Sequence, residues 1–96
     1  MKVVLTAAAK TDMTRVWGYY EKQRQGLGDE FLDDLGVAVR LIADFPFGPP
    51  EFYRGTRRVL LRRFPYGMAY RVAGDAIQII VIAHLSRASV VWRKRL

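Results

Sequence analysis

The stretch from Val59 to Arg87 constrains the fold more than any other, because it reads as a set of antiparallel strands. Alternate residues from Met68 to Val72 are apolar, which is the period of a strand with one buried face. The run from Ile77 to Ala83 is apolar and rich in β-branched residues, which favours a strand buried on both faces. Gly74-Asp75 lies between them and suits a two-residue hairpin turn, since glycine accepts a positive φ.

This turn fixes a register for the two strands. The predicted core pairs are Val72 with Ile77, Tyr70 with Ile79 and Met68 with Val81. On the other face Arg71 lies opposite Gln78, while Gly67 lies opposite Ile82 and close to His84. A slip of one residue would put Arg71 and His84 into the core, so the register is well specified. We therefore expect a sheet with one apolar face and one cationic face.

The first half of the chain predicts a short strand and then a helical hairpin. Lys2 to Thr6 forms the strand, and the Thr6 hydroxyl can cap the helix that follows. That helix should stop near Gln25-Gly26, and a second helix opens at Gly28-Asp29 and ends at Pro46. The apolar stripe of the first helix is Met13, Val16, Trp17 and Tyr20, and that of the second is Phe31, Leu35, Ala38, Ile42 and Phe45.

The second half predicts the rest of the sheet and a terminal helix. Arg57 to Phe64 forms the next strand, but its pattern leaves open which of its arginines share a face with Arg71. Ala88 to Leu96 forms a short helix that Val91 or Trp92 would dock. We predict one α+β domain over residues 1–96, with a short N-terminal strand, a helical hairpin, an antiparallel sheet of three further strands and a short C-terminal helix.

The composition excludes several classes of protein. The chain has no cysteine, so it has no disulfide framework and no thiolate metal site, and a reducing cytoplasm suits it. The apolar run at its N-terminus is too short for a signal peptide, and no apolar run in the chain is long enough to span a membrane. We expect a cytoplasmic protein without a metal or cofactor.

The net charge of +7 is distributed unevenly along the chain. Residues 1–53 hold six Lys or Arg against eight Asp or Glu, whereas residues 54–96 hold ten against a single acidic residue, Asp75. This excess in the second half exceeds what solubility requires. It indicates a nucleic acid or an acidic protein as partner, and charge alone does not choose between them.

The order of the elements and three segments resemble the RelE/ParE superfamily, the toxins of bacterial type II toxin–antitoxin pairs. The segments are RRFPYGMAYRV from Arg62 to Val72, IIVIAHLSR from Ile79 to Arg87, and the tail Trp92-Arg93. The resemblance covers nearly the whole chain. Within the superfamily, RelE-like members cut messenger RNA in the ribosome, while ParE-like members inhibit DNA gyrase. The FPY…YRV and H-x-S-R-x-x-x-x-W patterns are more similar to the ParE branch.

Physical reasoning supports the ParE branch. Ribonucleases of the superfamily usually place an arginine after the Pro-Tyr pair, and this chain has Gly67 there. Arg71 does not replace it, because it pairs with Gln78, roughly 20 Å along the strand from His84. The resemblance therefore implies a toxin that binds and inhibits gyrase and is neutralised by a cognate antitoxin with an acidic or amphipathic C-terminal segment. A RelE-like, ribosome-dependent endoribonuclease is the alternative.

Each hypothesis has its own candidate residues. Contacts with the target are assigned to Arg71, Arg87, Trp92 and Arg93, and contacts with the antitoxin to Trp17, Tyr20, Arg58, Arg62 and Arg63. A ribonuclease would use Arg62 or Arg63 together with His84 and Arg87. His84 is the only histidine, and we interpret it first as a structural residue at a strand end and second as a general acid or base.

Overall fold

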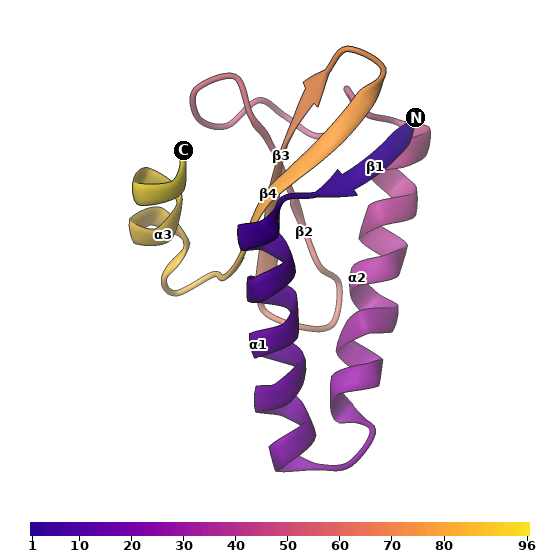
Figure 1. Cartoon of the computed structure of the whole chain (residues 1–96), viewed down its shortest axis with the longest axis vertical. Helices are drawn as coiled ribbons and strands as arrows, with labels where there is room; N and C mark the ends of the chain where they lie inside the picture. Colours follow the sequence, from indigo (N-terminus) through magenta and orange to yellow (C-terminus); the bar gives the residue numbers. More distant parts are fainter.

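The computed structural model describes residues 1–96 (Figure 1). Four strands in the order β1-β4-β3-β2 form a mixed sheet, and three helices pack around it. The elements are β1 (Lys2–Leu5), α1 (Ala7–Gln23), α2 (Leu27–Asp44), β2 (Arg57–Leu60), β3 (Tyr66–Ala73), β4 (Ala76–His84) and α3 (Ala88–Arg95). β1 runs parallel to β4, and the other neighbours are antiparallel. This arrangement confirms the predicted α+β fold and its order of elements.

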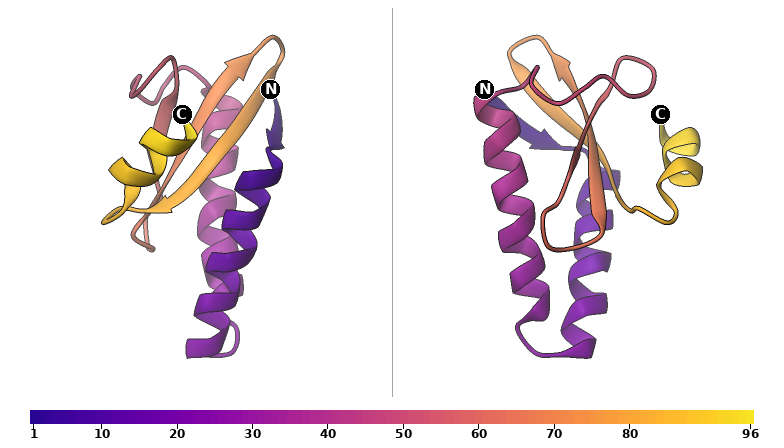
Figure 2. Two further views of the ribbon diagram at one scale, coloured as in Figure 1. Left: turned by 60° about the vertical axis from the view of Figure 1, so that its left-hand side comes forward. Right: turned by 180° about the vertical axis from the view of Figure 1, so that it is seen from behind.

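The helices cover the two faces of the sheet unequally. The α1–α2 hairpin packs on one face and extends beyond the sheet, while α3 lies on the opposite side (Figure 2). The larger core joins both hairpin helices to residues such as Met68, Tyr70 and Ile79, which have no exposed surface. A smaller core lies under α3, where Trp92 packs on Ala69 and Val81. No helix is long and apolar enough to cross a membrane.

The hairpin between α1 and α2 is held by local contacts. Thr6 caps α1 as predicted, because its hydroxyl oxygen accepts from the N–H of Ala9 at 3.1 Å. Between the helices, the Glu21 carboxylate accepts from the backbone N–H groups of Gly26 and Gly28, at 3.0 and 2.8 Å. Gly26 has a φ of 89°, which glycine adopts without steric cost. The turn therefore places the two helices side by side.

The register of the central hairpin departs from the prediction at one point. The pairs at Val72, Arg71 and Tyr70 are as predicted, but a bulge between Ala69 and Tyr70 shifts the rest by one residue. Met68 consequently pairs with Ile82 instead of Val81. The bulge turns Val81 onto the second face of the sheet, so that both faces of β4 are apolar.

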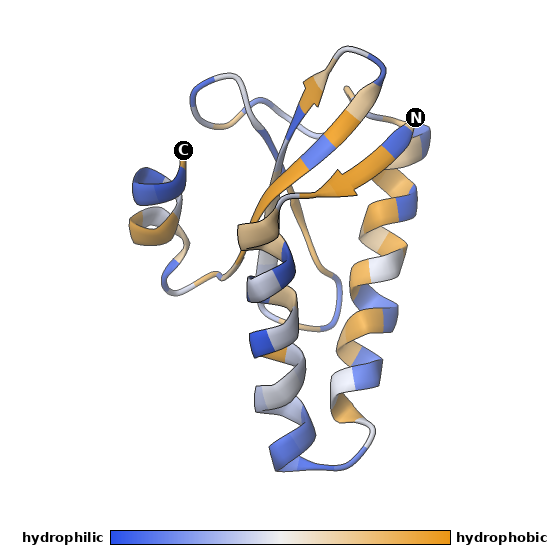
Figure 3. Cartoon of the chain, viewed as in Figure 1, coloured by the Kyte–Doolittle hydropathy of each residue, from blue (hydrophilic) through white to orange (hydrophobic).

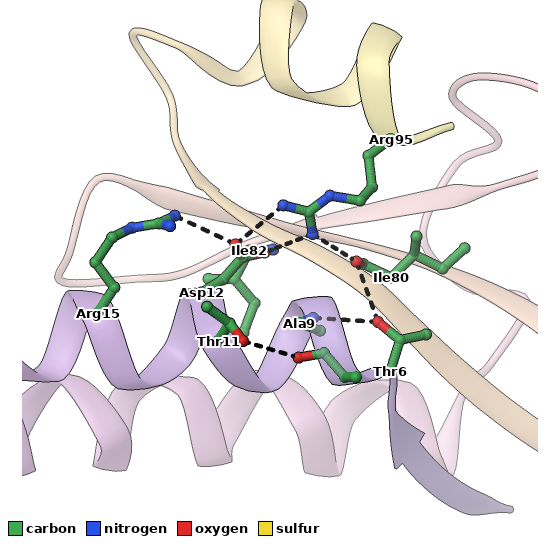
Figure 4. Close-up of polar contacts among 9 residues, drawn as sticks. Thr6, Ala9, Thr11, Asp12, Arg15, Ile80, Ile82 and Arg95 are labelled. Atoms are coloured by element: carbon green, nitrogen blue, oxygen red, sulfur yellow. Dashed lines mark hydrogen bonds and ion pairs between the residues drawn. The ribbon is translucent and has the colours of Figure 1, made fainter.

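A buried carboxylate, Asp12, joins α1 to the rest of the fold (Figure 4). Beyond the end of β1, the edge of β4 has no strand partner, and Asp12 accepts there from the N–H of Ile82 at 3.0 Å. Arg95 of α3 donates to the same carboxylate at 2.9 and 3.1 Å and to the Ile80 carbonyl at 3.0 Å. Arg15 adds an ion pair at 3.2 Å. These contacts satisfy backbone groups that would otherwise be unpaired at a sheet edge.

Asp34 plays the equivalent part on α2. It is 7% exposed, and its carboxylate accepts from the N–H groups of Arg63 and Phe64, at 2.9 and 3.0 Å. The loop between β2 and β3 is thereby tied to the hairpin. The predicted strand to Phe64 is accordingly wrong in its second half, because residues after Leu60 bend toward α2 instead of continuing the ladder.

Apolar residues lie along α2 (Figure 3), and at the end of this helix their burial differs from the prediction. Phe31, Leu35 and Ile42 are buried as predicted, but Phe45 is 63% exposed. Phe45 is the residue that ends the helix, with φ −133° and ψ 69°, so its side chain no longer follows the buried stripe. An apolar row on the outer side of α2 also stays exposed, at Val37 and Leu41.

Candidate functional site

The first candidate surface is an apolar groove between the end of α2 and the edge strand β2. It has a volume of about 620 Å³ and is lined by Leu41, Phe45, Gly48, Pro49, Pro50, Arg58, Val59 and Leu60. Leu41 is 47% exposed and Leu60 is 49% exposed, and Phe47 next to the groove is 62% exposed. Contiguous exposed apolar side chains of this kind mark protein interaction sites. We call this surface the apolar groove.

Arginines border the apolar groove. Arg57 donates to the carbonyls of Phe47 and Pro49, at 3.1 and 2.7 Å, and so fixes the loop after α2. The Arg58 guanidinium lies over the Phe52 ring at 4.4 Å and over the Trp92 ring at 5.2 Å. β2 is the last strand of the sheet, so beyond an isolated bridge between Glu51 and Arg57 its outer edge has no strand partner. The groove thus offers apolar surface, a strand edge and positive charge together.

The second candidate surface is a polar groove between α1 and the turn that links β4 to α3. Its volume is about 770 Å³, and its lining comprises Arg15, Val16, Tyr19, Tyr20, Gln23, Tyr66, Ile82, Ala83, His84, Ser86, Arg87 and Val91. No carboxylate lines it. The guanidinium of Arg87 is exposed and makes no hydrogen bond or ion pair within the chain. We call this surface the polar groove.

The hydrogen bonds of His84 indicate the tautomer of its neutral ring. The backbone N–H of Ser86 donates to Nδ1 at 3.1 Å, and the Ser86 hydroxyl lies 2.8 Å from the same nitrogen. Nδ1 is therefore an acceptor, and in the neutral ring the proton is on Nε2. The ring packs edge-on against Tyr66, with centroids 5.2 Å apart. In this state His84 offers a donor to the groove.

Tyr66 lines the polar groove with a side chain that is largely buried. Burial raises the pKa of Tyr66 to about 12, so its phenol stays protonated at neutral pH. Cleavage of RNA needs a group that takes the proton of the 2′-hydroxyl. The Nδ1 lone pair of His84 is already engaged, Tyr66 is protonated, and the groove has no carboxylate. The arrangement can hold an anion, and the groove lacks a carboxylate that could act as a general base.

The predicted antitoxin-binding arginines do not form one group. Arg58 lies at the apolar groove, on the face of the sheet that α3 covers. Arg71 is on the same face, so Arg58 is the arginine of β2 that shares a face with Arg71. Arg62 is exposed in the loop after β2. Arg63 is occupied, because it binds Glu30 at 2.8 Å, and Arg24 binds the same carboxylate at 2.7 Å. The hydrogen bond from Arg63, and then that from Arg24, lowers the pKa of Glu30.

The predicted aromatic contacts also separate. Trp17 is 38% exposed, and its indole N–H donates to Asp29 at 3.0 Å beside the hairpin turn. Tyr20 is half-buried and contacts the rings of Phe31 and Phe64. Tyr20 also lines the polar groove, whereas neither aromatic residue lines the apolar groove.

The structure likewise distributes the four residues predicted to contact the target. Arg87 lines the polar groove, Arg71 is half-buried on the sheet, and Arg93 is exposed on α3. Trp92 is 2% exposed, so the prediction that it touches a target directly is wrong. It instead docks α3, as the alternative prediction for this residue stated. The reason is that the second sheet face carries small side chains, and a large ring fills the space above them.

The endoribonuclease hypothesis would need a catalytic cation near Gly67, and the surroundings of this residue leave no space for one. A Cβ at this position would lie 3.2 Å from Leu60, 3.3 Å from Trp92 and 3.4 Å from Leu85. The position is buried among apolar side chains, and it pairs with Ala83 instead of Ile82. The expected cationic sheet face is therefore largely covered by α3, with Arg58 and Arg71 on either side.

Sequence reasoning missed several groove residues. Leu41 and Phe45 were absent from the predicted sites, although Phe45-Pro46-Phe47 places two aromatic rings around a helix-ending proline. Tyr19 and Tyr66 were also missed, because only the fold brings α1 beside the end of β4. Their signal in the sequence is weak, since tyrosines at helical or strand spacing are usually part of the core.

Comparison with known proteins agrees with this architecture. Residues 3–89 match the family described as "ParE toxin of type II toxin-antitoxin system, parDE". The chain is 28% identical over 80 residues to "Putative toxin Y4kP" of Sinorhizobium fredii, covering 82% of each protein. It also superposes on a structure titled "Chromosomal ParDE TA system from P. aeruginosa", with a TM-score of 0.76, 25% identity, and coverage of 88% of this chain and 96% of that one. With a family match over nearly its whole length and the same fold, this chain belongs to the ParE toxin family of type II toxin–antitoxin systems.

Proposed function

We propose that this ParE-family protein inhibits DNA gyrase by binding it, and that a cognate antitoxin neutralises it. The observation that carries the binding mechanism is the composition of the polar groove. Its exposed Arg87 and the Nε2–H of His84 are donors, and no carboxylate lines the groove. Such a surface gives electrostatic attraction and orientation without bond cleavage.

The same groove is what favours the alternative, a ribosome-dependent endoribonuclease. It brings His84 and Arg87 together with a tyrosine, which are residue types that can serve in phosphodiester chemistry. Arg63 does not join them, because it is bound to Glu30 and its backbone is tied to Asp34. We rank inhibition of gyrase first for this reason and because Gly67 is enclosed by apolar side chains.

For neutralisation, we propose that the antitoxin occupies the apolar groove. Leu41, Phe45 and Leu60 would be covered by an amphipathic segment of the antitoxin. Acidic side chains on that segment would meet Arg58, which makes the interface complementary in charge. Trp17 and Arg63 have internal partners and lie outside this groove, so we leave them out of the proposed interface.

Two assays on the purified protein separate the mechanisms. We expect inhibition of gyrase supercoiling of relaxed plasmid, relieved by the co-expressed product of a neighbouring antitoxin gene. We expect intact messenger RNA when the protein is added to a translating extract and the transcripts are mapped by primer extension. Cleavage in the ribosomal A site that disappears in both His84→Ala and Arg87→Ala would reverse the ranking.

A further inference from the structure

The polar groove combines positive charge, a hydrogen-bond donor and an exposed aromatic ring. Positive charge is present at Arg87 and Arg15, and the Nε2–H of His84 is a hydrogen-bond donor. Tyr19 adds an aromatic ring that is 58% exposed at the same groove. Donors, cations and an exposed ring face in one groove form a combination that single-stranded nucleic acids use.

We propose that the polar groove binds one nucleotide unit of a single-stranded nucleic acid without cutting it. Arg87, which has no partner in the chain, holds the phosphate. Arg15 adds positive charge from α1, where its exposed guanidinium also pairs with Asp12 at 3.2 Å. The base stacks on Tyr19, and the Nε2–H of His84 donates to a sugar or base oxygen. The volume of about 770 Å³ accommodates a nucleotide and excludes a duplex from entering.

An acidic protein segment is the competing occupant, and the structure favours the nucleotide. A carboxylate side chain needs a cation and gains nothing from an aromatic ring face. Tyr19 is one of the most exposed aromatic side chains of the protein, and its neighbour Tyr20 supports it through an edge contact with centroids 5.2 Å apart. The ring is therefore held in place for stacking while its surface remains open.

The inference is independent of the antitoxin site, and it concerns the same polar groove from which gyrase binding is proposed. The polar groove and the apolar groove share no lining residue. Loss of oligonucleotide binding and loss of gyrase inhibition are measured in separate assays, so either can fail without the other.

Fluorescence anisotropy with a labelled single-stranded DNA oligonucleotide tests the proposal on the intact protein. We expect Arg87→Gln to weaken binding about tenfold, as the loss of one charge-assisted hydrogen bond does, and to lower the salt slope by about one. Tyr19→Ala should weaken binding at least about fivefold, while Tyr19→Phe should keep it. Arg40→Gln removes the same charge from an exposed position on α2 and should change binding less than about twofold.

Three results would overturn the proposal. If Arg40→Gln weakens binding as much as Arg87→Gln, binding follows net charge and not the groove. If an unlabelled duplex competes as well as the single strand, the groove is not the contact. If a polyglutamate peptide displaces the oligonucleotide at the concentration of unlabelled single strand, the groove is a site for acidic protein. Tyr19 is exposed, so its two variants stay folded by circular dichroism and provide a result even if Arg87→Gln does not.

Discussion

The Asp12 carboxylate provides the sharpest test of how α3 is attached to the sheet. Its side chain is 1% exposed and accepts from the N–H of Ile82, from both terminal nitrogens of Arg95, and from Arg15 (Figure 4). Asp12→Ala removes the acceptor and leaves the donors in place. The Ile82 N–H then has no partner at an edge of β4 that β1 does not reach.

The expected destabilisation can be estimated from these contacts. An unpaired buried N–H costs about 1–3 kcal/mol, and breaking a buried ion pair costs about 3–5 kcal/mol. Arg95 is 27% exposed and keeps its bond to the Ile80 carbonyl, so part of its charge stays solvated. We therefore expect the free energy of unfolding to fall by about 3 kcal/mol. For a domain of this size that lowers Tm by about 12–24 °C.

Urea unfolding followed by circular dichroism measures this change. Asp33→Ala is the matched control, because Asp33 is an exposed aspartate on a helix, and it should change stability by less than about 0.5 kcal/mol. A double-mutant cycle with Arg95→Met should give a coupling of about 1–3 kcal/mol. A loss below about 1 kcal/mol in Asp12→Ala, or additive effects in the cycle, would refute the reasoning that Asp12 holds α3.

Three further predictions concern the grooves and the sheet. Leu41→Asp should abolish antitoxin binding in isothermal titration calorimetry and leave the urea midpoint unchanged, since Leu41 is 47% exposed; unchanged affinity would remove the apolar groove from the interface. Gly67→Ala should destabilise by about 1–3 kcal/mol, since its Cβ would lie 3.2 Å from Leu60 and 3.3 Å from Trp92, and an equal or higher urea midpoint would contradict this packing. The pKa of Tyr66 is raised from 10.0 to about 12, so its stabilising contribution is complete below pH 10 and is lost as the pH rises toward 12. Between pH 10 and 12 the free energy of unfolding of Tyr66→Phe should therefore fall less than that of the natural protein, as measured by urea unfolding at each pH. If the two proteins lose stability in parallel over this range, the phenol is not protected by burial.

The sequence by itself determined the elements and most of their order. The alternation before Gly74-Asp75 and the apolar run after it predict the central hairpin, because side-chain period and turn chemistry are local properties. The cap at Thr6 and the break at Pro46 are equally local. The family resemblance also came from local segments, and the family match confirmed it.

Only the tertiary structure decided which surfaces are free. The bulge beside Tyr70 depends on how β4 packs between two layers, and it turns Val81 toward α3. Trp92 is then buried over Gly67, whereas the sequence left it assigned both to the docking of the terminal helix and to contact with a target. Burial is set by contacts between residues that are far apart in the chain. A hydrophobic pattern predicts on which face of a helix or strand a side chain lies, and it does not predict which other element covers that face. For the same reason the two grooves, each formed by a helix and a distant strand, could not be read from the sequence.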